Sequence, residues 1–186
     1  LMVVHPKNLP DATLYALDQF VLGGGRALFF VDPFSEVDRG DPSDPSGGTR
    51  SSSLNRLLAA WGIHVDEGRI VADDRYAMTV GLGADSRPVR HLGVLGIEPA
   101  AMSPDDIITG NLNLMTFAFP GHISRDQDAT ASLQPLVESS ELAALLPTDQ
   151  LAIMSDPEML RAGFEPSGTR HVLAARLGGR VPSAFP

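Results

Sequence analysis

The first 32 residues place one helical pattern between two apolar runs, and this arrangement constrains the fold more than any other feature of the sequence. Residues 1–4 and 27–31 are uninterrupted apolar runs, which are typical of strands buried on both faces. Between them, Asn8 can cap a helix with apolar residues at helical spacing over residues 8–22, and the glycines that begin at Gly23 end it. The pattern predicts a βαβ unit with a right-handed crossover and two parallel strands.

The remainder of the chain is predicted to be richer in strands. Residues 34–53 form a long loop rich in Asp, Gly, Pro and Ser, and a short helix from Ser53 to Gly62 follows it. Further on, we expect strands at residues 77–80, 89–95, 112–119, 132–139 and 169–177, and a helix at residues 141–146. We therefore divide the chain into a βαβ-type α/β core, residues 1–74, and a β-leaning continuation of the same domain, residues 75–186.

Composition excludes several classes of function. The formal net charge is −9, and Lys7 is the single lysine, so neither nucleic acid nor an anionic membrane surface is an expected partner. The chain has no cysteine, which excludes disulfides, thiolate metal sites and a cysteine nucleophile. No run approaches the ~20 apolar residues of a membrane span. The sequence opens inside an apolar run, so we expect an excised portion from which targeting and anchoring segments have been left out.

Three polar residues follow the two predicted N-terminal strands. His5 and Asp32 each come directly after an apolar run, and Lys7 lies two residues beyond His5. Ligands of open α/β sheets bind at the carboxyl ends of the strands, so His5, Lys7 and Asp32 are the candidate ligand-binding residues. The alternative is that His-Pro and Asp-Pro simply terminate the strands.

The other candidate sites carry weaker signals. Asp38, Asp41 and Asp44 lie three residues apart, but they lack the alternating ligands, central glycine and final glutamate of a calcium loop, which favours a solvated acidic loop. Asp73 and Asp74 are neighbours whose side chains point to opposite faces of an extended segment. The five histidines show no metal-binding spacing, and no G-x-S-x-G turn is present. We therefore expect no catalytic residue, no metal site and no cofactor.

Sequence blocks spread over nearly the whole chain carry a family resemblance. They resemble the auxiliary component of ABC-type transport systems involved in gliding motility. The blocks are residues 4–9 (VHPKNL), 12–22, 24–26, 28–33 (LFFVDP), 57–62 (LLAAWG), 70–73, 117–121 (FAFPG), 173–177 and 183–186.

The resemblance implies a fold similar to class I glutamine amidotransferases. That fold is a three-layer α/β arrangement with a mostly parallel, flavodoxin-like sheet, here with a β-rich C-terminal part. A complete domain of this kind has additional strands before residue 1, so we expect a truncated sheet whose open edge a neighbouring copy completes. The catalytic cysteine of the amidotransferases is absent.

The resemblance also implies a function. We expect a non-catalytic binding subunit on the extracytoplasmic, periplasmic face of the inner membrane, membrane-anchored in its full-length form and paired with a permease and an ATPase. Two alternatives remain. One is a carbohydrate- or peptide-binding module that uses His5, Lys7 and Asp32, and the other is a cell-envelope hydrolase that uses carboxylates such as Asp32 and Asp73.

Overall fold

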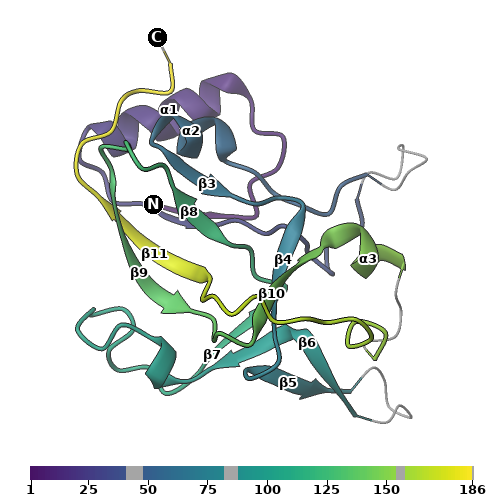
Figure 1. The fold of residues 1–186 in the computed structure, drawn as a ribbon. Helices are drawn as coiled ribbons and strands as arrows, with labels where there is room; N and C mark the ends of the chain where they lie inside the picture. Colours follow the sequence, from purple (N-terminus) through teal and green to yellow (C-terminus); the bar gives the residue numbers. More distant parts are fainter. Residues whose placement is uncertain (41–47, 82–87, 154–157, 186) are drawn as a thin grey trace.

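The computed structural model describes residues 1–40, 48–81, 88–153 and 158–185. Within them, short strands form several small sheets, and the helices lie at the margins (Figure 1). The elements are β1 (Met2–Val4), α1 (Asp11–Leu22), β2 (Leu28–Phe30), α2 (Asn55–Ala60), β3 (Ile63–Val65), β4 (Arg69–Asp73), β5 (Ala77–Val80), β6 (Val89–Ile97), the 3-10 helix η1 (Pro99–Ala101), β7 (Met115–Ala118), β8 (Ile123–Arg125), β9 (Ser132–Glu138), β10 (Ala143–Pro147), α3 (Thr148–Ile153) and β11 (Val172–Gly178).

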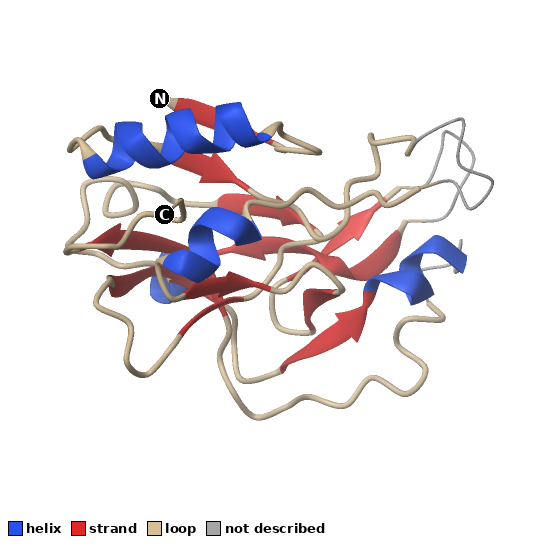
Figure 2. Ribbon diagram, turned by 90° about the horizontal axis from the view of Figure 1, so that it is seen from above, coloured by secondary structure: helices blue, strands red, loops and turns tan. Residues whose placement is uncertain are grey.

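The predicted N-terminal βαβ unit is confirmed. β1 and β2 pair in parallel with Val3 opposite Phe29, and α1 lies across the pair at one margin of the molecule (Figure 2). Leu14 and Leu17 are the buried apolar residues of α1, as the helical spacing predicted. The helix begins later than expected, because Asn8 has a positive φ of 51° and Pro10 occupies the N-cap position instead.

The expected fold class is wrong. Among the described strands, β1 and β2 form the one parallel pair; the other sheets, β4–β10, β9–β11, β3–β8 and β5–β6–β7, are antiparallel. The protein is therefore not a three-layer α/β fold with a mostly parallel sheet of the flavodoxin or glutamine-amidotransferase type. Parallel neighbours need a crossover of a dozen or more residues, usually a helix. After α1 the described α-helices are α2 and α3, of 6 residues each, so the later strands pair antiparallel.

The predicted helix at residues 141–146 is also wrong, because this segment forms the strand β10. β10 pairs with β4 in a register that sets Ala143 opposite Asp73 and Leu145 opposite Val71. Alanine and leucine favour helices, but an isolated helix this short is unstable, whereas pairing with the buried strand β4 covers both partners. Tertiary pairing therefore overrides local propensity here.

The end of the chain packs back on the N-terminal unit. Asp18 of α1 is fully buried, and it accepts hydrogen bonds from the Ser183 hydroxyl at 2.7 Å and the Ala184 backbone N–H at 3.1 Å. Phe185 contacts Tyr15 edge-to-face with ring centroids 5.5 Å apart. The C-terminal segment thus fixes α1, which lies over the β1–β2 pair.

Within the described part of the chain, no helix has the length and apolarity that crossing a membrane requires.

Candidate functional site at the ends of β1 and β2

The candidate site lies where the two parallel strands end, at one edge of the β1–β2 pair. His5 follows β1 with a positive φ of 48°, a conformation uncommon for residues other than glycine. Its backbone N–H donates to the carbonyl of Phe30 at 3.0 Å. His5 therefore stays bonded to β2 at the point where its own chain turns away from the sheet.

Both ring nitrogens of His5 face carboxylates. Nδ1 lies 2.8 Å from Asp32 Oδ2, and Nε2 lies 3.1 Å from Asp38 Oδ2. A protonated imidazole donates from both nitrogens, so it satisfies both contacts at once. The ring thus joins the end of β1 to the end of β2 and to the loop that follows β2.

Lys7 makes a second connection to the same loop. Its Nζ donates to Asp38 Oδ2 and to the carbonyl of Thr49, at 2.5 Å each. The other Asp38 oxygen accepts from the backbone N–H of Gly40 at 2.8 Å. Asp38 is therefore the common acceptor for His5, Lys7 and the loop backbone.

Ser52 anchors the far side of this loop. Its hydroxyl accepts from the Asp32 backbone N–H at 2.8 Å, and its own N–H donates to the Asp32 carbonyl at 2.8 Å. Ser52 is almost fully buried, so both bonds are shielded from water. The described flanks of the loop, residues 34–40 and 48–53, are thus fixed to the strand ends on both sides.

The charges of the cluster favour one another. The Lys7 ammonium, the Gly40 N–H and the His5 ring hold the pKa of Asp38 well below its usual range. Partial burial acts to lower the pKa of His5, but hydrogen bonds with Asp32 and Asp38 outweigh it and raise the pKa overall. Ionised Asp38 and protonated His5 therefore stabilise each other.

The three sequence-predicted residues, His5, Lys7 and Asp32, lie together in the structure, and Asp38 joins them. The sequence placed Asp38 only in an acidic loop with Asp41 and Asp44, which lie outside the described residues. No sequence signal singled it out, because a lysine near a strand end can be solvated and the loop offers several carboxylates. Loop geometry, which brings residue 38 back to residues 5 and 7, is not encoded by any local pattern.

Asp73 has a structural role. It is fully buried at the end of β4, where Oδ1 accepts from the Ser140 hydroxyl at 2.7 Å and from the Arg75 backbone N–H at 2.8 Å. The backbone N–H of Tyr76 at 3.3 Å and that of Ser140 at 2.6 Å complete its shell. Neighbouring Asp74 lies in the turn after β4 and pairs instead with Arg161 at 3.1 Å. The structure therefore does not bring these two carboxylates together.

His5, Lys7, Asp32 and Asp38 form what we call the strand-end cluster, and the other histidines lie apart from it. His122 and His171 contact each other with ring centroids 5.0 Å apart, and burial lowers the pKa of both. Burial also lowers the pKa of His91, which accepts from the Gly93 N–H at 3.0 Å. Across the residues that the structure describes, no group of three or more His, Cys, Asp or Glu side chains is placed to hold a metal ion.

The comparisons with known proteins identify the family. A family model described as an ABC-type uncharacterized transport system, of the auxiliary kind, matches residues 1–186. The chain belongs to this family. Searches of curated proteins and of solved structures gave no match.

Family membership gives the strand-end cluster its context. In this auxiliary ABC-transport protein, His5, Lys7, Asp32 and Asp38 are bound to one another. A ligand that used Lys7 would first have to displace Asp38. The geometry therefore assigns the cluster the role of bracing the loop, and recognition by this family member is better sought on surfaces whose groups are uncovered.

Proposed function

We propose that this auxiliary ABC-transport protein is a non-catalytic binding subunit of the gliding-motility type, which contacts the permease subunit of its transporter. In this proposal the full-length protein is membrane-anchored, lies on the extracytoplasmic, periplasmic face of the inner membrane, and works with a separate ATPase. The observation that carries the proposal is an uncovered apolar sheet face on the N-terminal unit.

This face consists of the outward side chains of β1 and β2. Met2 and Val4 are each 63% exposed, and Leu28 and Phe30 are each 46% exposed. Val3 and Phe29, which alternate with them, pack inward against the core that contains α1 and α2. We call the four outward residues, Met2, Val4, Leu28 and Phe30, the N-terminal apolar face.

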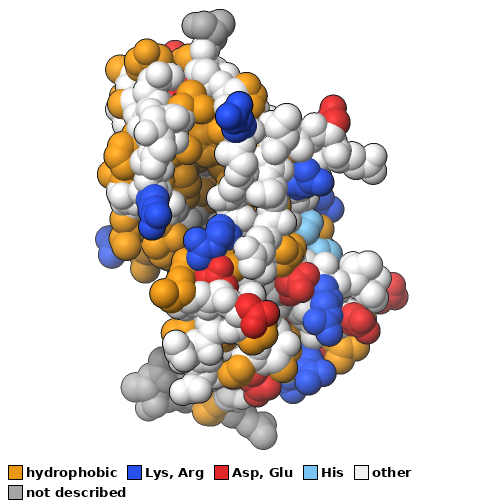
Figure 3. All heavy atoms as spheres, turned by 90° about the vertical axis from the view of Figure 1, so that its left-hand side faces the viewer, with side chains coloured by type: hydrophobic (Ala, Val, Ile, Leu, Met, Phe, Trp, Pro, Cys, Tyr) orange, Lys and Arg blue, Asp and Glu red, His pale blue; other side chains and the backbone are white. Residues whose placement is uncertain are grey.

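Other apolar side chains of the N-terminal unit are exposed as well. Leu1 and three outward residues of α1, Tyr15, Phe20 and Leu22, are exposed. Figure 3 shows hydrophobic side chains gathered along the upper left of that view, over the N-terminal unit. Monomeric proteins rarely leave contiguous apolar patches beyond a few hundred Å² uncovered, and larger ones mark contacts with partners.

Sheet physics supports the same conclusion. Parallel strands are normally covered on both faces, and a two-stranded sheet has little stability by itself. Burying each Val, Leu, Met or Phe side chain contributes about 1.5–3 kcal/mol. A partner that covers the N-terminal apolar face therefore gains a substantial free energy of association, and in a transport-system family the permease is the partner to test first.

The test is site-specific photo-crosslinking of the full-length protein in membranes of its own host. A benzoylphenylalanine replacing Phe30 is expected to cross-link to the permease, and the ATPase is expected to co-purify with that adduct. The matched control places the same group at Asn113, an exposed polar position between η1 and β7. Adducts confined to the protein's own chain or to a second copy, or equal permease capture from position 113, would overturn the proposal.

A further inference from the structure

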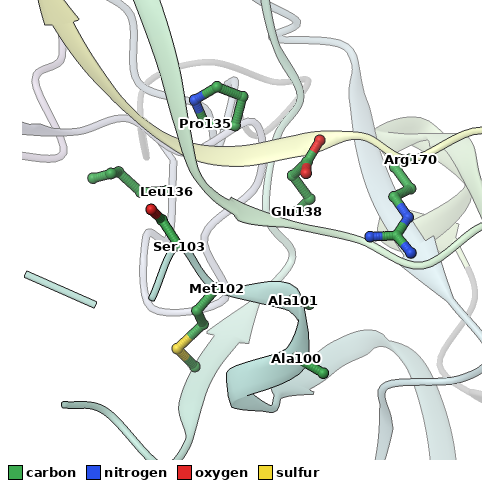
Figure 4. Close-up of a pocket in the computed structure, with 8 residues that line it drawn as sticks. All are labelled: Ala100, Ala101, Met102, Ser103, Pro135, Leu136, Glu138 and Arg170. Carbon is green, nitrogen blue, oxygen red and sulfur yellow. The ribbon is translucent and has the colours of Figure 1, made fainter. Parts of the chain in front are cut away.

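A second region of the protein contains a cavity lined by two charged side chains that have no hydrogen-bond or ion-pair partner among the described residues. The cavity has a volume of about 310 Å³, and it lies between η1 with the residues after it and the end of β9 (Figure 4). It belongs to the core around β6, β9 and β11, apart from the core that supports the N-terminal apolar face. Its lining is Ala100, Ala101, Met102, Ser103, Pro135, Leu136, Glu138 and Arg170.

One wall of the cavity is apolar and held in place by backbone bonds. Ala101, Met102 and Leu136 are buried members of the same core cluster. The Ser103 N–H donates to the Leu136 carbonyl at 2.8 Å, and Met102 forms a β-bridge with Val137. This wall is therefore pre-formed, as small-molecule sites usually are.

Glu138 and Arg170 supply the two charges. Arg170 lies two residues before Val172, the β11 residue that pairs with Glu138, and diagonal neighbours on antiparallel strands are spaced by about 7–8 Å. Within the described residues, neither side chain makes a hydrogen bond or an ion pair, although both line the same cavity. Nearby Arg176 behaves differently, because it binds both oxygens of Asp106, at 2.7 and 2.9 Å.

We propose that this cavity binds a small zwitterion, a free amino acid or a dipeptide with an apolar side chain. Arg170 pairs with the ligand carboxylate, for which a guanidinium offers two parallel N–H donors. Glu138 accepts from the ligand ammonium, and the apolar side chain lies against Met102 and Leu136. Glu138 is half-buried and Arg170 is exposed, so charge complementarity decides between the classes of ligand. A lone anion would match Arg170 alone and a neutral sugar would match neither charge, whereas a zwitterion matches both.

The volume agrees with a ligand of this size. About 310 Å³ is at the lower end of the range for small-molecule sites, ≈ 300–1,000 Å³. The inference goes beyond the proposed function, because ligand binding here needs neither the permease nor the N-terminal apolar face.

The test is calorimetric titration of the protein with L-leucine and, separately, with leucyl-leucine. At least one is expected to bind, and Glu138→Gln and Arg170→Gln should each weaken binding about tenfold or more. The matched controls are Glu141→Gln and Arg180→Gln, which remove exposed charges outside the cavity and should leave affinity unchanged. Thermal unfolding of all four variants checks that each one folds.

Two analogues assign each charge to its partner. Leucinamide lacks the carboxylate, so its weaker binding should be insensitive to Arg170→Gln. N-acetylleucine lacks the ammonium, so its binding should be insensitive to Glu138→Gln. Absence of binding by both leucine and leucyl-leucine, or equal affinity of the cavity and control variants, would overturn this inference and leave the permease contact untouched. If position 30 gives no cross-link to the permease while leucine still binds, the proposed function would be overturned and this inference would stand.

Discussion

His5 Nδ1 lies 2.8 Å from Asp32 Oδ2. This single ring–carboxylate contact joins His5, which directly follows β1, to Asp32, which lies just beyond the end of β2. The two residues are 27 positions apart in the sequence, and the βαβ crossover brings them to the same edge. The contact also makes the stability of this end of the molecule depend on pH, because the raised pKa of His5 favours the charged imidazole.

Protonation of His5 is expected to stabilise the fold at acidic pH. The pKa of His5 is raised above its ordinary value of 6.5, so its contribution is fully present below that value and is lost as pH rises through the folded-state pKa. His5→Gln should therefore cost about 1 kcal/mol of unfolding free energy at about pH 5.5, and less at about pH 9, as expected for a partly exposed pair. Urea denaturation at both pH values measures the difference.

A double-mutant cycle with Asp32→Asn isolates this contact, since His5 is the one side-chain partner of the Asp32 carboxylate in the described structure. The coupling energy should be about 0.5–1 kcal/mol at the acidic pH and should fall towards zero at the alkaline pH. A coupling that stays constant with pH would mean that proton binding to His5 does not contribute.

Asp73 and Asp74 are adjacent carboxylates that should respond very differently to mutation. Asp73 is buried and accepts four hydrogen bonds, so Asp73→Ala leaves buried donors at Ser140 and Tyr76 and a part-buried donor at Arg75 unpaired, and it should cost about 3–5 kcal/mol. Asp74→Ala removes a part-exposed ion pair with Arg161 and should cost less than about 1 kcal/mol. Urea denaturation of the two variants side by side checks the contrast, and similar losses would contradict it.

His122 and His171 should make the fold sensitive to acid. Burial lowers the pKa of both rings, so their contribution is present above the ordinary value of 6.5 and is lost as pH falls through the folded-state values. This sign is opposite to that of His5. His122 Nδ1 is buried without a hydrogen-bond partner in the described structure, so a proton added at that nitrogen would find no acceptor there.

The variant His122→Phe keeps an aromatic ring beside His171 and removes one proton-binding group. The quantity to measure is the pH dependence of the unfolding free energy, and not its value at neutral pH. The slope of unfolding free energy against pH between about pH 4.5 and 6.5 should decrease by up to one proton equivalent. An unchanged slope would place the acid sensitivity elsewhere.

The sequence predicted local features well and the sheet poorly. The βαβ unit follows from apolar runs and helical spacing within about 32 residues, and the strand-end residues His5, Lys7 and Asp32 follow from the parallel pairing. The pairing of β10 with β4 joins segments some 70 residues apart, and no local pattern reports it. Beyond the βαβ unit, the mostly parallel sheet was inferred from family resemblance and not from strand spacing, and short helices such as α2 do not supply the crossovers that such a sheet needs.

The cavity residues show the same limit. Glu138 lies in a predicted strand and Arg170 near the start of another, and neither has a neighbouring motif that suggests a site. Their proximity depends on the register of β9 against β11, including the irregularities after Val172. Only the fold reveals that both charges line one cavity and that neither has a partner in the part of the chain that the structure describes.

Gly62, which the sequence predicted to end the helix α2, should be far less tolerant of substitution than Gly24. Both have positive φ, 72° and 86°, so alanine is strained by about 1–2 kcal/mol at either position. A Cβ at Gly62 would lie 2.4 Å from the Cβ of Ala129, whereas one at Gly24 would meet nothing within 4 Å. Gly62→Ala should therefore cost a further 1–3 kcal/mol, approximately, for overpacking against the β8–β9 connection. Thermal unfolding compares the two variants, and adding Ala129→Gly to Gly62→Ala should recover much of the excess loss, because it removes the 2.4 Å contact and leaves the milder one with the Ala129 Cα at 3.3 Å. Equal destabilisation by Gly62→Ala and Gly24→Ala would show that Ala129 moves aside at little cost.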